Sequence, residues 1–360
     1  MQDGVRWLDE QDLALINALQ LHPRASWSVL GATLGVDPVT VARRWSRLSA
    51  RGEAWVALSP GPRLFERVCV AFVEIDCPLG DAPQVVRALN DRPHLLTIER
   101  AAGGYDLLAT VATADLAAMS RLTLDVLPTV PGVSAVRARI VTHMFTEGGR
   151  WRIDALAPGQ RAQLTATTAP PATGERQRRT VPTTAADRAI LDRLAHDGRA
   201  SYRALAAALD TSASTVKRRV DRLVGLGLLR LRCDFARPLG GWPVAVTFWA
   251  KVPPADLPDI GHAVMRLPQT RNCAAVSGPN NLVVQASLHA LADVPRFETR
   301  LAAVHPAVDI AERVITLRHE KLLGRLLDAH GRSVGVVPPD LWSEPESPAS
   351  PSTGISGPRG

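Results

Sequence analysis

Two stretches of the chain gather arginine and hydroxyl side chains on one face of a predicted helix. Residues 40–47 read TVARRWSR, and residues 215–222 read TVKRRVDR. Guanidinium groups make two-pronged contacts to phosphates and base edges, and crowded like charges destabilise a helix unless a partner compensates them. We therefore expect both faces to bind double-stranded DNA, whereas a solvated basic face is the alternative for a single helix. The residues assigned to DNA contact are Thr40, Arg43, Arg44, Arg47, Ser214, Thr215, Lys217, Arg218, Arg219 and Arg222.

Both stretches belong to a module that occurs twice. Sliding the chain by 175 residues aligns Asp12 with Asp187 and Leu48 with Leu223 without a gap, and roughly sixteen of about forty positions are identical. Apolar spacing and capping residues predict three short helices in each copy, and the third is the one that reads DNA in helix-turn-helix proteins. The duplication therefore favours DNA binding over a solvated face. The predicted helix starts lie near Leu8, Ser26 and Asp37, and near Thr184, Ser201 and Ser212.

A second repeated pattern follows each of these modules. Residues 67–77 alternate between apolar and polar side chains like a strand, and the order strand, helix, strand, strand, helix, strand continues to residue 143. The same order returns over residues 243–317, and it is the order of a ferredoxin-like domain. The sequence therefore predicts an α+β fold, with two winged-helix-like helix-turn-helix domains and two ferredoxin-like (βαββαβ) domains in tandem.

These patterns define the expected domain boundaries. Segments rich in Pro, Ala, Thr and Ser bury too little apolar surface to fold, so they are expected to be flexible. The predicted parts are helix-turn-helix domains at 1–60 and 183–235, ferredoxin-like domains at 64–150 and 240–325, a flexible linker at 157–182 and a disordered tail at 340–360.

Composition narrows the class of protein further. The net charge of +7 and the pI of about 9.9 favour a polyanionic partner. The four cysteines are scattered, with no Cys-x-x-Cys pair and no histidine at metal-ligand spacing, so neither a metal nor another cofactor is expected. No apolar run is long enough to span a bilayer, and the acidic start is unlike a signal peptide. We expect a soluble, cytoplasmic protein that does not bind membranes.

The combination of these units resembles a known family. A helix-turn-helix that reads LDEQDLALINALQLHPRASWSVLGATLGVDPVTVARRWSRLSARGE, followed by a sheet domain with GGYDLL at its central hairpin, resembles the Lrp/AsnC family of bacterial transcription regulators. The resemblance covers about residues 8–145 and again about 184–320. It implies a regulator that dimerises through its sheet domain, known as the RAM (amino-acid-metabolism regulatory) domain. A tandem of two units is then expected to form an intramolecular pseudo-dimer, or a homo-oligomer.

The resemblance also implies a place for a small effector, such as an amino acid. The family's Gly-x-Tyr/Phe-Asp loop corresponds here to Gly103, Gly104, Tyr105 and Asp106. A carboxylate there could pair with an ammonium group. The alternative is a tight turn, with glycines at positive φ and Asp106 bonded to local backbone. In the second copy the loop reads GPNN over residues 278–281, without the carboxylate, so the two units are not expected to bind effector equally.

The two helix-turn-helix copies also differ in charge. Residues 183–232 carry ten basic and five acidic residues, whereas residues 1–60 carry six of each. The second copy is therefore expected to supply more of the phosphate affinity. If both third helices enter successive major grooves, half-sites should lie roughly 34 Å apart, or a multiple of that, as an imperfect palindrome.

Two other functions compete with regulation. One branch with the same fold decarboxylates siroheme, and it carries a His-Asn-Tyr-x-Arg type segment before its central hairpin. The matching segments here, LLTIERAAGGYD and TRNCAAVSGPNN, contain no histidine and keep only Arg100 and Arg271. No catalytic residue is therefore assigned, and the protein is not expected to be an enzyme. The other reading is an amino-acid sensor whose helix-turn-helix serves only assembly, and the arginine face in both copies weakens it.

Overall fold

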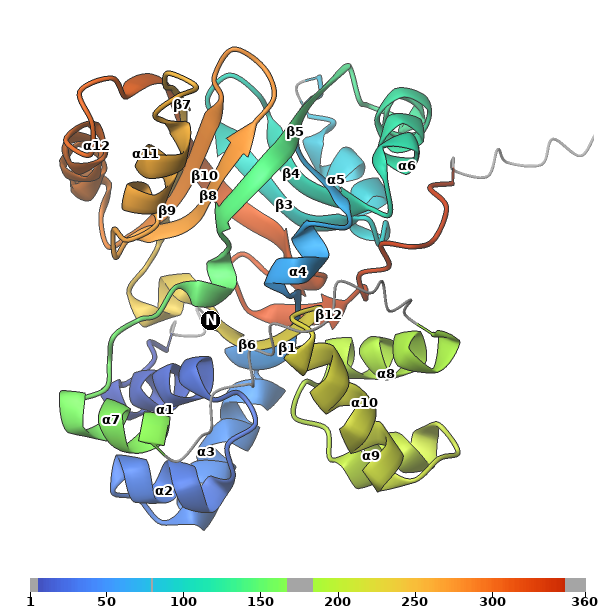
Figure 1. Cartoon of the computed structure of the whole chain (residues 1–360), viewed down its shortest axis with the longest axis vertical. Helices are drawn as coiled ribbons and strands as arrows, with labels where there is room; N and C mark the ends of the chain where they lie inside the picture. Colours follow the sequence, from blue (N-terminus) through green and yellow to red (C-terminus); the bar gives the residue numbers. More distant parts are fainter. Residues whose placement is uncertain (1–5, 79, 167–183, 347–360) are drawn as a thin grey trace, which may run out of the picture.

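The protein is represented by a computed structural model that describes residues 6–78, 80–166 and 184–346 (Figure 1). Two helical units, which we call head 1 and head 2, lie side by side below a single large sheet assembly. Strands of both halves of the chain form that assembly, and helices cover its outer faces. The predicted α+β tandem fold is confirmed.

Head 1 consists of α1 (Glu10–Leu21), α2 (Trp27–Leu34) and α3 (Pro38–Ala50). Each helix begins at a side-chain cap: Asp9, Ser26 and Asp37 each accept a backbone N–H of the first turn. These caps confirm the starts that the sequence predicts. Leu15, Leu19, Leu30 and Leu48 are among the buried residues that join the three helices into one core.

Head 2 repeats this arrangement with α8 (Ala185–His196), α9 (Tyr202–Ala208) and α10 (Ala213–Gly225). Thr184, Ser201 and Ser212 cap the three helices. Its core is smaller and is built around Ile190, Leu194, Leu205, Val216 and Val220.

A two-stranded ribbon joins the heads. Strand β1 (Ala54–Pro60) follows head 1, β6 (Leu229–Phe235) follows head 2, and the two pair antiparallel with Ala54 opposite Phe235 and Pro60 opposite Leu229. Each head therefore hangs from one strand of the same ribbon, directly below the sheet assembly (Figure 1).

Each half of the chain then contributes a βαββαβ unit. The first contains β2 (Cys69–Asp76), α5 (Ala82–Asn90), β3 (Leu95–Ala102), β4 (Leu107–Thr113), α6 (Leu116–Ser120) and β5 (Ala135–Thr146). The second contains β7 (Val244–Lys251), α11 (Leu257–Val264), β8 (Thr270–Val276), β9 (Leu282–Leu288), α12 (Val294–Ala302) and β10 (Asp309–Leu322).

The two units close into one sheet. Strand β5 of the first unit pairs with β8 of the second, and the long β10 pairs both with β3 of the first unit and with β7 of its own. The order β10-β3-β4-β2-β5-β8-β9-β7 therefore returns to β10. Between the two βαββαβ units an apolar cluster includes Phe72 and Trp249, whose rings meet edge to face at 6.2 Å. The pairing that the family resemblance implies between two chains occurs here within one.

Two predicted flexible segments are partly ordered. Residues 158–166 of the expected linker form α7 (Pro158–Ala166), whose fully buried Leu164 packs into the core of head 1. Asn17 accepts backbone N–H groups of Ala155 and Leu156 and so fixes the approach to α7. The prediction was wrong here because polar composition hid a single well-placed apolar side chain. The remainder of the linker, residues 167–182, lies outside the described residues.

The start of the expected tail is also packed. After β11 (Arg325–Leu327) and β12 (Ser333–Val336), Leu341 is buried against Leu64, Val70 and Leu96. The disorder predicted for residues 340–346 was therefore wrong, and residues 347–360 lie outside the described residues. Every helix within the described ranges is too short or too polar to cross a bilayer.

Candidate functional site

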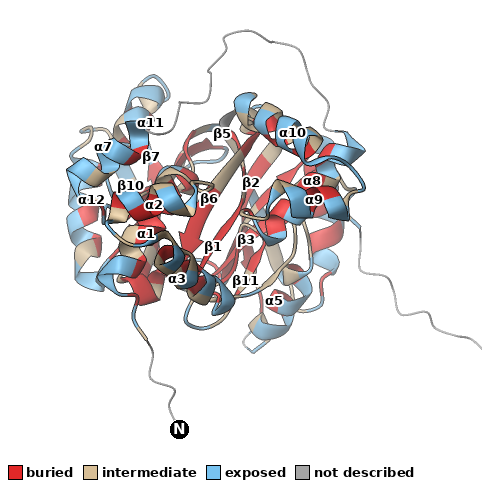
Figure 2. Ribbon diagram, turned by 90° about the horizontal axis from the view of Figure 1, so that it is seen from below, coloured by how far each residue is buried: buried red, intermediate tan, exposed pale blue. Residues whose placement is uncertain are grey.

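The third helix of each head presents one face to the core and one to the outside. Val41, Trp45 and Leu48 are buried on α3, and Val216, Val220 and Leu223 are buried on α10, as the helical spacing predicts. Seen from below, exposed strips run along both helices, while the strands between the heads are mainly buried (Figure 2). The two helices therefore lie on the same side of the molecule.

Two of the three arginines assigned to DNA in head 1 have partners inside the protein. The carboxylate of Asp12, 0% exposed, accepts Arg44 Nη1 at 2.6 Å and Arg47 Nη2 at 2.5 Å. Asp9 also accepts Arg44 Nη1, at 2.9 Å. The compensation that we expected from DNA phosphates is thus supplied by carboxylates of α1 and its cap. Sequence spacing could not reveal this because the partners lie more than thirty residues apart.

Head 2 repeats the same anchor. Asp187, also 0% exposed, accepts Arg219 Nη1 at 3.0 Å and Arg222 Nη2 at 2.6 Å. Burial opposes ionisation of this carboxyl, but hydrogen bonds from Thr184 and Arg219 and the charge of Arg222 outweigh it and lower the pKa of Asp187. Arg219 and Arg222 therefore hold α10 against α8, which is a structural role that the sequence prediction did not assign.

Fewer side chains of the third helices remain available for DNA than the sequence predicts. Among the described residues, Arg43 and Arg218 have no hydrogen bond or ion pair, and both are exposed. Lys217 is exposed too, and its hydrogen bond with Asp221, 2.5 Å long, raises the pKa of the ammonium. Ser214 is exposed, and Thr40 and Thr215 are half-buried at the edge of the same faces.

A reciprocal contact locks the two heads together. Arg24 donates to the carbonyls of Gly198 and Ala200 at 2.6 and 2.7 Å, and its repeat equivalent Arg199 donates to those of Pro23 and Ala25 at 2.6 and 2.8 Å. We call this pair the arginine clasp.

Aromatic rings complete the arginine clasp. The Arg24 guanidinium lies over the ring of Tyr202 at 4.5 Å, and that of Arg199 lies over the ring of Trp27 at 4.0 Å. Burial and the nearby Arg24 lower the pKa of Arg199 to about 10. Trp27 and Tyr202 thus pack between the heads.

The loop proposed for the effector forms a contact between the two halves. The N–H of Gly104 donates to Glu312 Oε1 at 3.1 Å, and the buried Tyr105 hydroxyl accepts Trp249 Nε1 at 3.2 Å. Asp106 Oδ2 accepts the N–H of Cys77 at 2.8 Å. A Cβ on Gly103 would approach Val314 to 2.8 Å, so close packing requires this glycine.

The repeat equivalent of Asp106 has the same structural role. Asn281 pairs with both backbone groups of Val252, at 2.9 Å each, just as Asp106 binds the backbone of Cys77. The prediction of a tight turn was wrong in its details: Asp106 binds backbone, but that of Cys77, 29 residues away, and Gly103 and Gly104 do not have positive φ. An effector role for residues 103–106 stays a prediction, and none of them lines the cavity described next.

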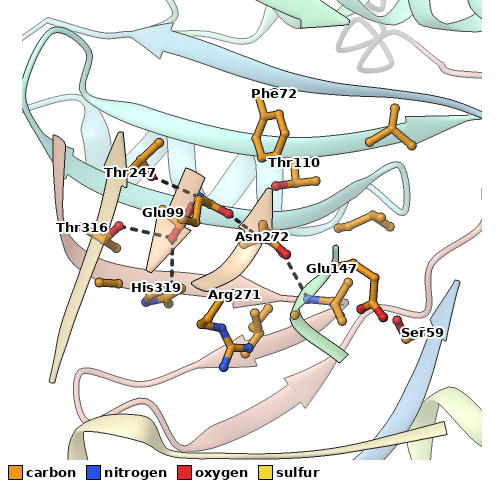
Figure 3. A pocket seen from close by; sticks show the side chains of 18 of the residues that line it. Ser59, Phe72, Glu99, Thr110, Glu147, Thr247, Arg271, Asn272, Thr316 and His319 are labelled. Carbon is orange, nitrogen blue, oxygen red and sulfur yellow. Dashed lines mark hydrogen bonds and ion pairs between the residues drawn. The ribbon is translucent and has the colours of Figure 1, made fainter. Parts of the chain in front are cut away.

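A cavity lined by both charged and apolar side chains, which we call the chamber, lies between the two βαββαβ units at the end nearest the ribbon. Its lining comes from both halves of the chain and from β1 and β6, and its volume is about 70 Å³. Figure 3 shows Glu99, Thr247, Thr316 and His319 gathered on one side, with Arg271 and Glu147 nearer the ribbon side. Apolar side chains such as Phe72 complete the wall.

On one side of the chamber, both carboxylate oxygens of Glu99 accept hydrogen bonds. Glu99 accepts His319 Nε2 and Gln285 Nε2, each at 2.9 Å, and the Thr316 hydroxyl at 3.2 Å. Burial opposes ionisation of Glu99, yet the bond from His319 outweighs it and lowers the pKa of the carboxyl. Burial and the charge of Arg237 lower the pKa of His319 as well. The pair is therefore a carboxylate that accepts from a neutral imidazole.

Three buried arginines occupy the other side. Arg232 pairs with Asp234, and Arg271 Nη2 lies 3.7 Å from the same carboxylate, with its guanidinium over Trp151 at 4.8 Å. The side chain of Arg237 makes no hydrogen bond or ion pair with any described residue, although the charges of Asp234 and Glu99 act on it. Burial and neighbouring arginines lower the pKa of Arg271 well below its usual value.

Sequence reasoning missed most of this chamber. Only Arg271 was considered, because the other residues come from separate strands. One signal was present: the charged side chains of Arg230, Arg232 and Asp234 alternate along β6, which is typical of a strand with one polar face. Within the described ranges, no cluster of His, Cys, Asp or Glu is placed to hold a metal ion.

The architecture defines a class of protein: a tandem helix-turn-helix protein whose heads share one closed ligand-domain-type sheet. A model of the AsnC-type helix-turn-helix domain matches residues 8–49 and 184–224, and a model of the Lrp/AsnC ligand binding domain matches residues 70–151. The chain belongs to the Lrp/AsnC family.

Relatives of known sequence correspond to one unit of the tandem. An uncharacterized HTH-type transcriptional regulator of Pyrococcus horikoshii is 29% identical over 140 residues, which is 38% of this chain and 87% of that protein. The leucine-responsive regulatory protein of Escherichia coli K12 is 28% identical over 149 residues, 40% of this chain and 90% of that protein.

A solved structure is similar along nearly the whole chain. The siroheme decarboxylase NirDL matches 91% of this chain and 95% of its own, with a TM-score of 0.55 and 13% identity. This likeness shows that the two proteins share a tandem fold.

Proposed function

We propose that the protein is a sequence-specific DNA-binding transcriptional regulator whose two heads bind two half-sites of one operator. The observation that carries this proposal is the arginine clasp, together with the β1–β6 ribbon. Both fix the third helices of the heads on one side of the molecule. A fixed pair of reading helices is what a two-half-site duplex requires.

The exposed faces support the proposal. The anchors at Asp12 and Asp187 hold α3 and α10 on their heads, so that Arg43 and its repeat equivalent Arg218 project outward without protein partners. Their side chains are free to contact phosphates or base edges, and each neutralised phosphate releases counterions.

We also propose that a small effector modulates this regulator and that the protein is not an enzyme. His319 enters the chamber from β10, although the two hairpin segments contain no histidine. Burial and the charge of Arg237 lower the pKa of His319 and outweigh the bond to Glu99, which raises it, so His319 is a poor proton donor near pH 7. A chamber of about 70 Å³ holds roughly five waters, far less than a tetrapyrrole occupies.

Binding of the purified chain to duplex fragments of its own promoter, across a salt series, tests the proposal. A double variant, Arg43→Ala with Arg218→Ala, should weaken binding and reduce the log–log salt slope by roughly two. Arg296→Ala, which removes a 78% exposed arginine on α12, is the matched control and should change neither quantity. An unchanged slope in the double variant would contradict the proposal. A titration with siroheme, followed by absorbance, tests the competing enzyme.

A further inference from the structure

The chamber contains two buried guanidinium groups that the protein itself leaves without hydrogen bonds. Arg237 and Arg271 are 7% and 6% exposed, and both line the chamber. Neither side chain donates a hydrogen bond to any residue in the described part of the chain. Arg271 has the 3.7 Å approach to Asp234 and the contact with the Trp151 ring. A buried charge without a partner is costly, so a well-ordered site of this kind points to a missing anion.

The acids around the chamber are already engaged. Glu99 binds His319, Gln285 and Thr316, as described above. Glu147 pairs with Arg230, and Asp234 pairs with Arg232. The charges of Asp234 and Glu99 favour the charged form of Arg237, but neither carboxylate in this part of the structure accepts a hydrogen bond from it. Burial outweighs both charges and lowers the pKa of the guanidinium.

The size and wall of the chamber restrict the anion. Its volume of about 70 Å³ suits a molecule of roughly five to ten non-hydrogen atoms, by comparison with the volume of a single water. The wall between the polar groups is apolar and includes Val70, Phe72 and Leu96, which favours a short hydrocarbon chain over a fully hydrated ion.

We propose that the chamber binds a small dicarboxylate of four or five carbons, with one carboxylate accepting from Arg237 and the other from Arg271. Two-pronged pairing between a guanidinium and a carboxylate provides both the affinity and the orientation. The Thr247 and Asn272 side chains of the same wall offer further hydrogen bonds.

Such a ligand would connect the heads to the sheets. Arg237 lies directly after β6 of the ribbon, whereas Arg271 lies on β8 of the closed sheet. Binding to both would hold the ribbon, and the heads that hang from it, in one orientation. This regulatory part rests on the proposed DNA-binding function; the binding of the dicarboxylate does not.

Calorimetric titration of the full chain tests the inference. Succinate and glutarate are the probes, and butyrate and inorganic phosphate are the comparison ligands. We expect saturable binding of one dicarboxylate per chain, at least about tenfold tighter than butyrate, because butyrate leaves one guanidinium unpaired. Equal binding of butyrate or phosphate, or no binding of either dicarboxylate, would overturn the assignment.

Variants locate the site. Arg237→Met should abolish dicarboxylate binding, and because it removes a buried charge that has no hydrogen-bond partner, it should raise the melting temperature of the ligand-free protein. Arg100→Gln, which alters a half-exposed arginine outside the chamber, is the matched control and should bind as the parent does. Dicarboxylate binding that survives Arg237→Met would place the ligand elsewhere and overturn the proposal.

The DNA experiment separates the two proposals. Dicarboxylate binding without any site-selective duplex binding would refute the regulator and leave the ligand site standing. Site-selective duplex binding by a chain that ignores both dicarboxylates would refute the ligand site and leave the regulator standing.

Discussion

The two heads share an interior and differ on their surfaces. In both, one fully buried aspartate of the first helix holds two arginines of the third. Head 1 is additionally covered by α7 and has Trp45 where head 2 has the smaller Val220. Head 2 has Lys217 and the larger excess of positive charge. Duplication has thus preserved what holds a head together, while the surfaces that meet other molecules have diverged.

Removing the shared anchor should have the largest effect. Asp187→Ala leaves Arg219 and Arg222 without their buried partner, and we expect head 2 to lose about 3–5 kcal/mol of stability. Asp12→Ala should cost head 1 less, because Asp9 still accepts Arg44. Hydrogen exchange, read separately in α8–α10 and α1–α3, measures both losses. Equal losses would show that Asp9 adds nothing.

Removing the cover of head 1 should have the next largest effect. Leu164→Ala empties a fully buried position and should destabilise α7 and α2 by about 2–4 kcal/mol. Exchange rates in head 2 should not change. Thr165→Ala, at the exposed neighbouring position, is the control. Faster exchange in both heads would mean that the two are one cooperative unit.

Opening the arginine clasp should have an intermediate effect. Arg24→Gln removes two charged hydrogen bonds and a ring contact, at a cost of about 1–3 kcal/mol. The heads would then be held by the ribbon and by the Arg199 half of the clasp only, so the variant should tolerate half-sites moved apart by roughly five base pairs better than the parent does. Arg199→Gln should behave alike, and additive effects in the double variant would show that the two arginines act independently.

The difference in surface charge should have the smallest effect. Replacing Lys217 and Arg218 with alanine removes two exposed charges from head 2, whereas Arg43→Ala removes one from head 1. The salt slope of duplex binding should fall by roughly two in the first case and one in the second. A larger fall from Arg43→Ala would assign the main phosphate affinity to head 1.

Local signals in the sequence were enough to predict the units of the fold but not how they join. The 175-residue repeat and the helix caps are short-range features, so the three helices of each head were predicted correctly. The anchor was missed because Asp12 and Arg44 belong to different helices, and side-chain direction decides which charges meet. The closing pairs β5–β8 and β10–β3 join strands from opposite halves, which no local pattern encodes.

The same difference between local and long-range features explains which site residues could be predicted from the sequence. The exposed Arg43 and Arg218 could be predicted because they lie on one helix face. The chamber could not, because Glu99, Arg237 and Arg271 come from three segments that only the closed sheet brings together.

The pairing of β5 with β8 and of β10 with β3 joins two halves of one chain, so the two halves are always present in a ratio of one to one. In a protein assembled from separate subunits, the match between two unlike halves depends on how much of each is synthesised and on dilution. Here one messenger RNA yields both halves in equal number, and each finds its complement within its own chain at any concentration. Divergence between the halves, once established, can therefore persist without competition from assemblies of two identical halves.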